Sequence, residues 1–191
     1  MSLDRAWRAL CIALVAALTA CATPTTRVES TGAATTAGTF IADGRISARR
    51  GNDGVAGQFT WRHDESRDTI DLTTPLGQTI ARLEGDERSV RIQRSDGHND
   101  VARDWDTLTE RSLGVTLPVS GLLAWLQGVP RQGSQFTIEH DARNRPSLIR
   151  QDGWEIAYTY GDDEATRVSR LTLRYGATEP VEVRIAVDRW Q

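Results

Sequence analysis

Few side chains in this sequence have types and spacing that suit catalysis or metal binding. His63, His98 and His140 lie among polar residues, and no two of them have a metal-ligand spacing such as H-x-x-x-H. No serine lies in a G-x-S-x-G motif. We therefore expect all three histidines to be solvated at turns or strand edges, with no metal site and no enzymatic activity.

Cys21 has the most specific chemical context in the chain. It follows a short apolar run that begins after two arginines and is too short to span a bilayer. Such a run is typical of a secretory signal peptide, and the sequence Leu-Thr-Ala-Cys that ends at Cys21 resembles the lipobox of bacterial lipoproteins. Cys11 would leave with the signal, so Cys21 would be the only thiol of the mature chain and no intramolecular disulfide could form.

The sequence predicts three parts. Residues 1–20 form a lipoprotein signal peptide, residues 21–39 a lipidated cysteine with a flexible tether, and residues 40–191 a folded domain. The lipobox implies N-acyl and S-diacylglycerol groups on Cys21 and no other cofactor. Ala22, rather than Asp, follows the cysteine, which implies sorting to the outer membrane, with the domain facing the periplasm.

The composition fits an ordinary globular domain. Hydrophobic residues make up 39% and charged residues 26%, with a formal net charge of −3, so we expect no nucleic-acid partner. Five of the six tryptophans lie within residues 40–191, which is more than a domain of this size needs to fill a solid core.

From Phe40 onward the dominant hydrophobic period is two, as in half-buried strands separated by turn signals. Clear examples are the runs around Phe59, 154–160 and 181–187. Many short strands at close spacing predict a sandwich or a barrel.

Two short helices interrupt this pattern. The first is expected over 104–113 with Asp104 as its cap, and the second over 120–127 with Ser120 as its cap and Gly128 at its end. Leu122, Trp125 and Leu126 make the second helix apolar on most sides, so another element must cover it. We expect it to cover a curved sheet.

Six segments occur in the order typical of one protein family. They are Phe59-Thr60-Trp61, Leu72 to Thr79, Leu113-Gly114 with Leu117-Pro118-Val119, Leu122 to Pro130, Gly153 to Tyr158, and Trp190. Together they resemble the LolB family of outer-membrane lipoproteins, which receive other lipoproteins from the soluble periplasmic carrier LolA. One departure is that 31–39 lacks the amphipathic helix that such chains often carry before the first strand.

The resemblance implies a mainly β fold: an incomplete, open antiparallel barrel with short helices over an apolar cavity. It implies a monomeric receptor that takes lipoproteins from a LolA-like carrier by their acyl chains and inserts them into outer-membrane lipid. The residues that would line the acyl-chain cavity are Trp61, Trp125, Trp154, Trp190, Leu122 and Leu126.

The segment Pro75-Leu76-Gly77 follows a predicted strand and has the composition of a turn. On sequence grounds Leu76 either protrudes or folds back onto the barrel rim. The resemblance favours protrusion and implies a role in passing the lipoprotein into the membrane.

Two other classes of function are weighed beside this one. A lipid-tethered hydrolase is disfavoured, because no catalytic set is evident. A structural or assembly lipoprotein that binds an outer-membrane protein stays open, because it too could be a β domain on a tether.

Overall fold

The computed structural model describes residues 28–29, 38–86, 88–113, 118–162, 165–178 and 180–191. Cys21, the predicted signal peptide and most of the predicted tether lie outside these ranges. Within them, no helix has the length and apolarity needed to cross a membrane.

The described strands form one twelve-stranded sheet, in the order β1-β8-β9-β10-β11-β12-β2-β3-β4-β5-β6-β7. Every neighbouring pair is antiparallel. The strands are β1 Val28–Glu29, β2 Phe40–Arg50, β3 Asp53–Asp64, β4 Arg67–Thr73, β5 Thr79–Gly85, β6 Val90–Arg94, β7 Asn99–Ala102, β8 Phe136–His140, β9 Pro146–Gln151, β10 Trp154–Tyr160, β11 Val168–Tyr175 and β12 Val181–Trp190.

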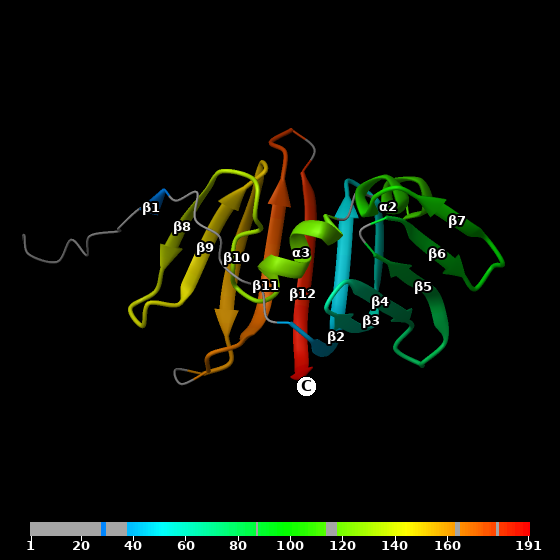
Figure 1. Cartoon of the computed structure of the whole chain (residues 1–191), viewed down its shortest axis with the longest axis horizontal. Coiled ribbons are helices and arrows are strands. Elements are labelled where there is room, and N and C mark those ends of the chain that lie inside the picture. The colour runs from blue at the N-terminus through cyan, green and yellow to red at the C-terminus, as the bar shows by residue number, and fades with distance from the viewer. Residues whose placement is uncertain (1–27, 30–37, 87, 114–117, 163–164, 179) are drawn as a thin grey trace, which may run out of the picture.

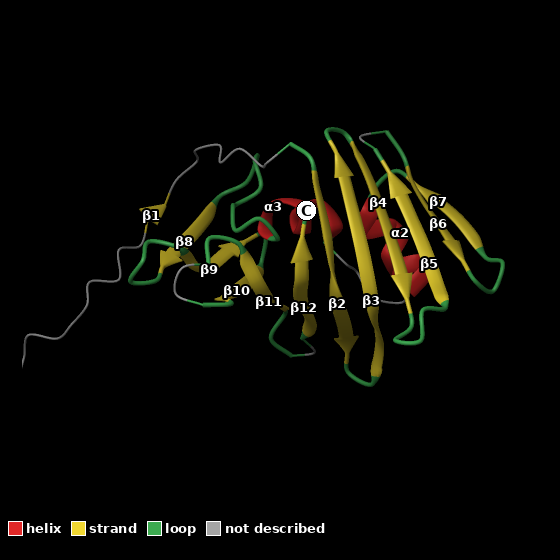
Figure 2. Ribbon diagram, turned by 90° about the horizontal axis from the view of Figure 1, so that it is seen from below, coloured by secondary structure: helices red, strands yellow, loops and turns green. Residues whose placement is uncertain are grey.

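The sheet is open, because its end strands β1 and β7 do not pair with each other. Its centre is the long pairing of β12 with β2, which joins the two ends of the folded chain (Figure 1). Helix α2 (Trp105–Leu113) and helix α3 (Val119–Trp125) both lie on one face of the sheet, as the two views together show (Figure 2). The predicted incomplete antiparallel barrel, covered by short helices, is therefore confirmed.

Alternation along each strand decides which face is buried. In β10, Trp154, Ile156 and Tyr158 are buried, whereas the residues between them are exposed. The buried side chains of all the long strands meet α2 and α3 and form one hydrophobic core. The opposite face carries charged side chains, including the cross-strand ion pair of Arg62 with Asp71.

The two helices begin differently. Asp104 caps α2 as predicted, since its Oδ1 accepts a hydrogen bond from the N–H of Thr107 at 2.7 Å. The prediction of Ser120 as the cap of α3 is wrong. The N-cap is Pro118, which has no side-chain cap bond, and its carbonyl accepts the bond from the N–H of Leu122 at 2.7 Å.

A two-residue strand lies inside the predicted tether. In β1, Val28 pairs with Ile138 and Glu29 with Thr137 of β8. The prediction of a flexible tether did not include this pairing. The remaining predicted tether residues up to 37 lie outside the described residues.

Candidate functional site

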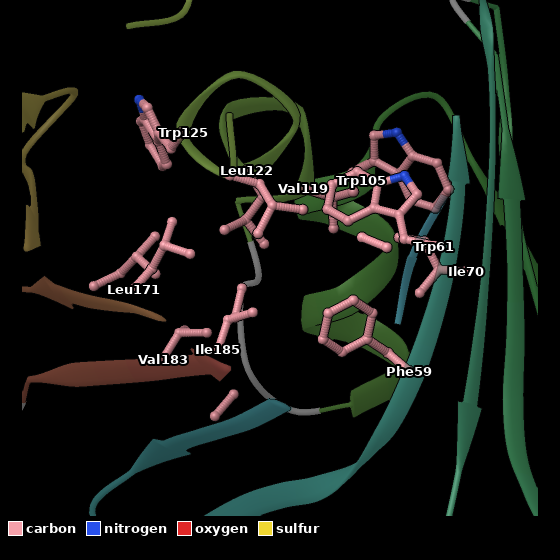
Figure 3. Close-up of a cluster of buried hydrophobic side chains, with 14 of the residues drawn as sticks. Phe59, Trp61, Ile70, Trp105, Val119, Leu122, Trp125, Leu171, Val183 and Ile185 are labelled. Carbon is pink, nitrogen blue, oxygen red and sulfur yellow. The ribbon is translucent and has the colours of Figure 1, made fainter. Parts of the chain in front are cut away.

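A small apolar cavity lies between α3 and the concave face of the sheet. Its volume is about 30 Å³, and all of its lining residues are apolar. They are Ile46, Phe59, Trp61, Ile70, Leu72, Leu83, Val119, Leu122, Leu126 and Ile185. Figure 3 shows Phe59, Trp61 and Ile70 facing Val119, Leu122 and Ile185 across this space.

Helical and strand periodicities bring these side chains together. Val119, Leu122 and Leu126 are spaced three and four residues apart, so they share the face of α3 that points to the sheet. Phe59 and Trp61 are two residues apart on β3 and therefore share its inner face.

The polar atom of Trp61 is satisfied outside the cavity. Its indole N–H donates a hydrogen bond to Oδ1 of Asp68 at 2.6 Å, and both side chains are buried. Because the N–H has this partner, the ring can line an apolar cavity without leaving a polar group unpaired.

The carboxylate of Asp68 also contacts His63, and the prediction that this histidine is solvated is wrong. This histidine is buried rather than solvated, and its Nδ1 lies 3.0 Å from Oδ1 of Asp68. The two residues pair directly across β3 and β4, a relationship that only the sheet register creates. His98 and His140 are exposed, as predicted.

Trp125 lies on the other flank of α3. Its ring centroid is 6.4 Å from that of Trp154, and its indole N–H donates to Oε1 of Gln151 at 2.8 Å. Trp154 in turn stacks on Tyr175, with their centroids 5.2 Å apart. Both tryptophans line a second pocket, of about 400 Å³, rather than the apolar cavity.

The second pocket is mixed in character. Its charged lining residues include Arg50, Asp106, Arg131 and Asp152, and Arg131 forms an ion pair with Asp152. Burial raises the pKa of Asp106, and the negative charge of Asp104 adds to the shift. This polar wall suits a water-filled opening better than an enclosure for acyl chains.

Trp190 is the last residue of the central strand β12, whereas the second pocket lies at the start of that strand, at Val181. The ring centroid of Trp190 lies 5.6 Å from that of Phe40, and its indole N–H donates to the carbonyl of Val168 at 3.0 Å. The structure therefore brings Trp61, Leu122 and Leu126 together at the apolar cavity and places the other three tryptophans elsewhere.

The sequence did not predict that the other residues line the cavity, although some of them lie in the family motifs. Among them, Ile46 and Ile185 are paired across β2 and β12. Alternation marked Ile185 as inward-facing, but it could not show which inward residues lie beneath α3. That depends on the strand order.

The residues between β4 and β5 form a tight turn. The N–H of Gly77 donates to the carbonyl of Thr74 at 2.9 Å, and the N–H of Thr74 donates to the carbonyl of Gln78 at 2.8 Å. Gly77 has a φ of +80°, which glycine adopts without strain.

Leu76 protrudes from this turn and is 89% exposed, the most exposed of the large hydrophobic residues described. Protrusion, the first of the two predicted alternatives, is confirmed. Because turns alternate between the two ends of an antiparallel sheet, Leu76 lies at the same end as the β2–β3 and β11–β12 turns, which border the second pocket (Figure 2).

Comparison with known proteins assigns the chain to a family. The profile of the family described as "Outer membrane lipoprotein LolB" matches residues 39–190. The chain belongs to the LolB family. This confirms the resemblance seen in the sequence, and the match covers every strand from β2 to β12.

Curated relatives in the LolB family cover nearly the whole chain. "Outer-membrane lipoprotein LolB" of Azoarcus sp. is 35% identical over 177 residues, covering 92% of this chain and 90% of the relative. The protein of the same name from Cupriavidus metallidurans is 35% identical over 193 residues, covering 94% and 93%. As a LolB family member, the chain is an outer-membrane lipoprotein.

The fold has relatives among solved structures as well. A putative outer membrane lipoprotein-sorting protein domain from Vibrio parahaemolyticus is similar with a TM-score of 0.54, covering 81% of this chain and 85% of that one. Its sequence identity is 9%, so the likeness concerns the fold alone.

Proposed function

We propose that this protein accepts lipoproteins from a LolA-like periplasmic carrier and inserts them into the outer membrane. The observation that carries the proposal is the wholly apolar cavity between α3 and the sheet. Family membership supports the proposal and disfavours the alternative of an assembly lipoprotein.

The chemistry of the cargo explains why such an enclosure is needed. A mature lipoprotein carries about three acyl chains, and each methylene exposed to water costs about 0.8 kcal/mol. The chains therefore cannot cross the periplasm in free solution. They must pass directly from one apolar enclosure to another, and the sequence has no nucleotide-binding G-x-x-x-x-G-K-[ST] loop to drive the step. Transfer would follow increasing affinity, from carrier to receptor to bilayer.

The cavity must widen to take this cargo. Its volume of about 30 Å³ has room for only one or two water-sized groups, far less than an acyl chain needs. Val119, Leu122 and Leu126 fill the space from above, and α3 has only seven residues. A helix this short depends on its packing for stability. We infer that acyl chains replace these three side chains against the sheet as α3 moves outward.

Leu76 would act at the second step, insertion into the membrane. The rigid turn holds an apolar side chain in water at one end of the sheet. Burying this side chain in the outer leaflet would contribute about 1.5–3 kcal/mol, enough to orient a tethered domain without anchoring it alone. The anchor would be the N-acyl and S-diacylglycerol groups on Cys21.

A transfer assay with labelled lipoprotein, carrier and liposomes tests the proposal, scoring acceptance and insertion separately. The chain is used as a Cys21→Ala variant with a cleavable signal in place of the lipoprotein signal, because the described core begins at Phe40 and does not involve the anchor. A fluorescent fatty acid should bind it and be displaced by lipoprotein. The proposal fails if no saturable binding is seen.

The matched variants lie side by side on α3. Leu122→Glu places a carboxylate in the cavity lining and should weaken acyl binding at least tenfold. Leu123→Glu changes a neighbouring residue that is half-buried and does not line the cavity, so binding should change little. Equal binding by the two variants would argue against this cavity.

A further inference from the structure

One buried polar atom of the described side chains has no hydrogen-bond partner among the described residues: the hydroxyl of Tyr158. Tyr158 lies on β10 and is 9% exposed. Buried hydroxyl groups are almost always paired, because an unpaired one loses its hydrogen bonds to water without replacement. This hydroxyl therefore needs an explanation.

The other buried polar groups around the core show what is normal here. The indole N–H of Trp61 donates to Asp68 and that of Trp125 to Gln151. Tyr160, two residues along β10 on the same face, donates its hydroxyl hydrogen to the carbonyl of Pro146 at 2.9 Å. Tyr158 differs from its nearest equivalent on the same strand.

The sheet register places Tyr158 in one cross-strand row with two residues that line the apolar cavity. Tyr158 pairs with Leu171, Leu171 with Ile185, and Ile185 with Ile46. Directly paired residues share a face of the sheet, so the four side chains form one row under the helices. Ile185 and Ile46 line the cavity, and Figure 3 shows Leu171 beside Ile185 on the side that faces α3.

The row also gives the distance between Tyr158 and the residues that line the cavity. Tyr158 stands two strands away from Ile185, which is roughly 10 Å at the usual strand spacing. A group bound at Tyr158 could therefore belong to the same molecule whose apolar tail fills the cavity beneath Leu122 and Leu126.

The hydroxyl can act only as a neutral donor or acceptor. Burial, with a smaller contribution from Tyr160, raises the pKa of Tyr158 well above its ordinary value. The phenol therefore keeps its proton at physiological pH, and its O–H can donate to an acceptor on a ligand that reaches it when α3 moves outward.

We propose that Tyr158 donates a hydrogen bond to an acyl carbonyl oxygen of the bound lipid, either an ester of the diacylglyceryl group or the amide of the N-acyl chain. This inference rests on the proposed function, in which acyl chains enter the cavity. An acyl chain is hydrocarbon except for its carbonyl, so a single hydrogen-bond donor among apolar side chains fits it. The hydrogen bond would set the depth of the chain, with its tail directed across β11, β12 and β2 toward Phe59 and Trp61 on β3.

Matched ligands that differ in the carbonyl test the proposal on the Cys21→Ala chain. The probes are methyl palmitate and N-methylpalmitamide, each ¹³C-labelled at the carbonyl, with hexadecane as the ligand that lacks one. The protein should bind at least one carbonyl probe about 2- to 10-fold more tightly than hexadecane, the effect of one net hydrogen bond. The infrared carbonyl stretch of that bound probe should lie at lower frequency than the stretch of the same probe dissolved in a hydrocarbon solvent, where the carbonyl has no donor.

Two variants separate the role of Tyr158 from a general packing effect. Tyr158→Phe should abolish both the preference and the infrared shift while still binding hexadecane. Tyr160→Phe removes a hydroxyl that already has a partner and should keep both.

The outcomes distinguish failure of the Tyr158 hydrogen bond from failure of the proposed acyl-chain function. Binding of all three probes with equal affinity and no shift overturns the role of Tyr158 and leaves the acyl-chain cavity standing. A shift that persists in Tyr158→Phe also overturns this role. Binding of none of the probes overturns the proposed function and this inference together. The absence of an infrared shift in the unsubstituted protein overturns the role of Tyr158 even if a variant folds poorly.

Discussion

The indole N–H of Trp125 donates a hydrogen bond to Oε1 of Gln151 at 2.8 Å, which joins α3 to the end of β9. Gln151 is almost completely buried, and the same oxygen accepts the backbone N–H of Arg131 at 2.9 Å. Its amide nitrogen donates to the carbonyl of Arg131 and to the hydroxyl of Ser134, each at 2.8 Å. One side chain thus fixes the helical cover, and the segment that follows it, to the sheet.

We expect Gln151→Leu to lower the free energy of unfolding by about 2 kcal/mol or more. The substitution leaves the indole N–H of Trp125 and the backbone groups of Arg131 without their partner, and each buried unpaired group costs about 1–3 kcal/mol. Urea denaturation of the Cys21→Ala chain measures the change. Gln93→Leu, at an exposed strand position, is the control and should stay within about 0.5 kcal/mol. Similar values for the two variants would contradict the role of Gln151.

The same substitution should speed the uptake of a fluorescent fatty acid. If α3 must move outward before acyl chains enter, weakening its attachment to β9 raises the population of the open form. Stopped-flow mixing should show a several-fold faster association than in the Gln93→Leu control. An unchanged rate would mean that the cavity opens elsewhere.

Leu76→Glu should leave acceptance from the carrier intact and slow insertion into liposomes at least tenfold. The charged side chain cannot enter the leaflet, and the turn is held by backbone hydrogen bonds that the substitution does not alter. Val101→Glu is the control, because Val101 is also an exposed apolar residue, at 63%, but lies on the edge strand β7. If both variants insert cargo at the wild-type rate, Leu76 is an ordinary surface residue.

The two tyrosines of β10 should respond in opposite ways to loss of the hydroxyl. Tyr160→Phe removes a hydrogen bond to the carbonyl of Pro146 and should destabilise the domain by about 0.5–1.5 kcal/mol. Tyr158→Phe removes a buried group with no partner among the described residues and should be neutral or stabilising. Thermal unfolding without lipid compares them. A large loss of stability in Tyr158→Phe would show that its hydroxyl has a structural partner.

The domain should lose stability in acid. A hydrogen bond from the hydroxyl of Thr60, aided by Arg189, lowers the pKa of Asp43, and the backbone N–H of Arg145 lowers that of Asp141. A carboxyl whose pKa is lower in the folded state stabilises that state above its unfolded pKa of about 3.9, and this contribution is lost as the pH falls through the folded value.

The free energy of unfolding should therefore fall below about pH 4. Asp43→Asn cannot titrate at this position, so its pH profile should be flatter in this range than that of the wild type. Parallel profiles of the two proteins would contradict the role of Asp43.

The sequence by itself determined the properties that depend on neighbouring residues. Alternation along β10 and β12 predicted their buried faces, and Asp104 predicted the start of α2, because these patterns are local. The ordered motifs identified the family. Composition also predicted the turn at Leu76, although its exposure needed the structure.

Only the tertiary structure decided which residues converge. The sequence offers no way to distinguish the roles of four tryptophans, Trp61, Trp125, Trp154 and Trp190. Because the sheet stays open, β3 and β10 lie several strands apart, so Trp61 and Trp154 do not meet in one cavity. His63 is buried because the register sets Asp68 opposite it. The unpaired hydroxyl of Tyr158 depends in the same way on which groups from distant strands and loops come within reach. Local pattern sets the direction of each side chain, and long-range strand pairing sets its partners.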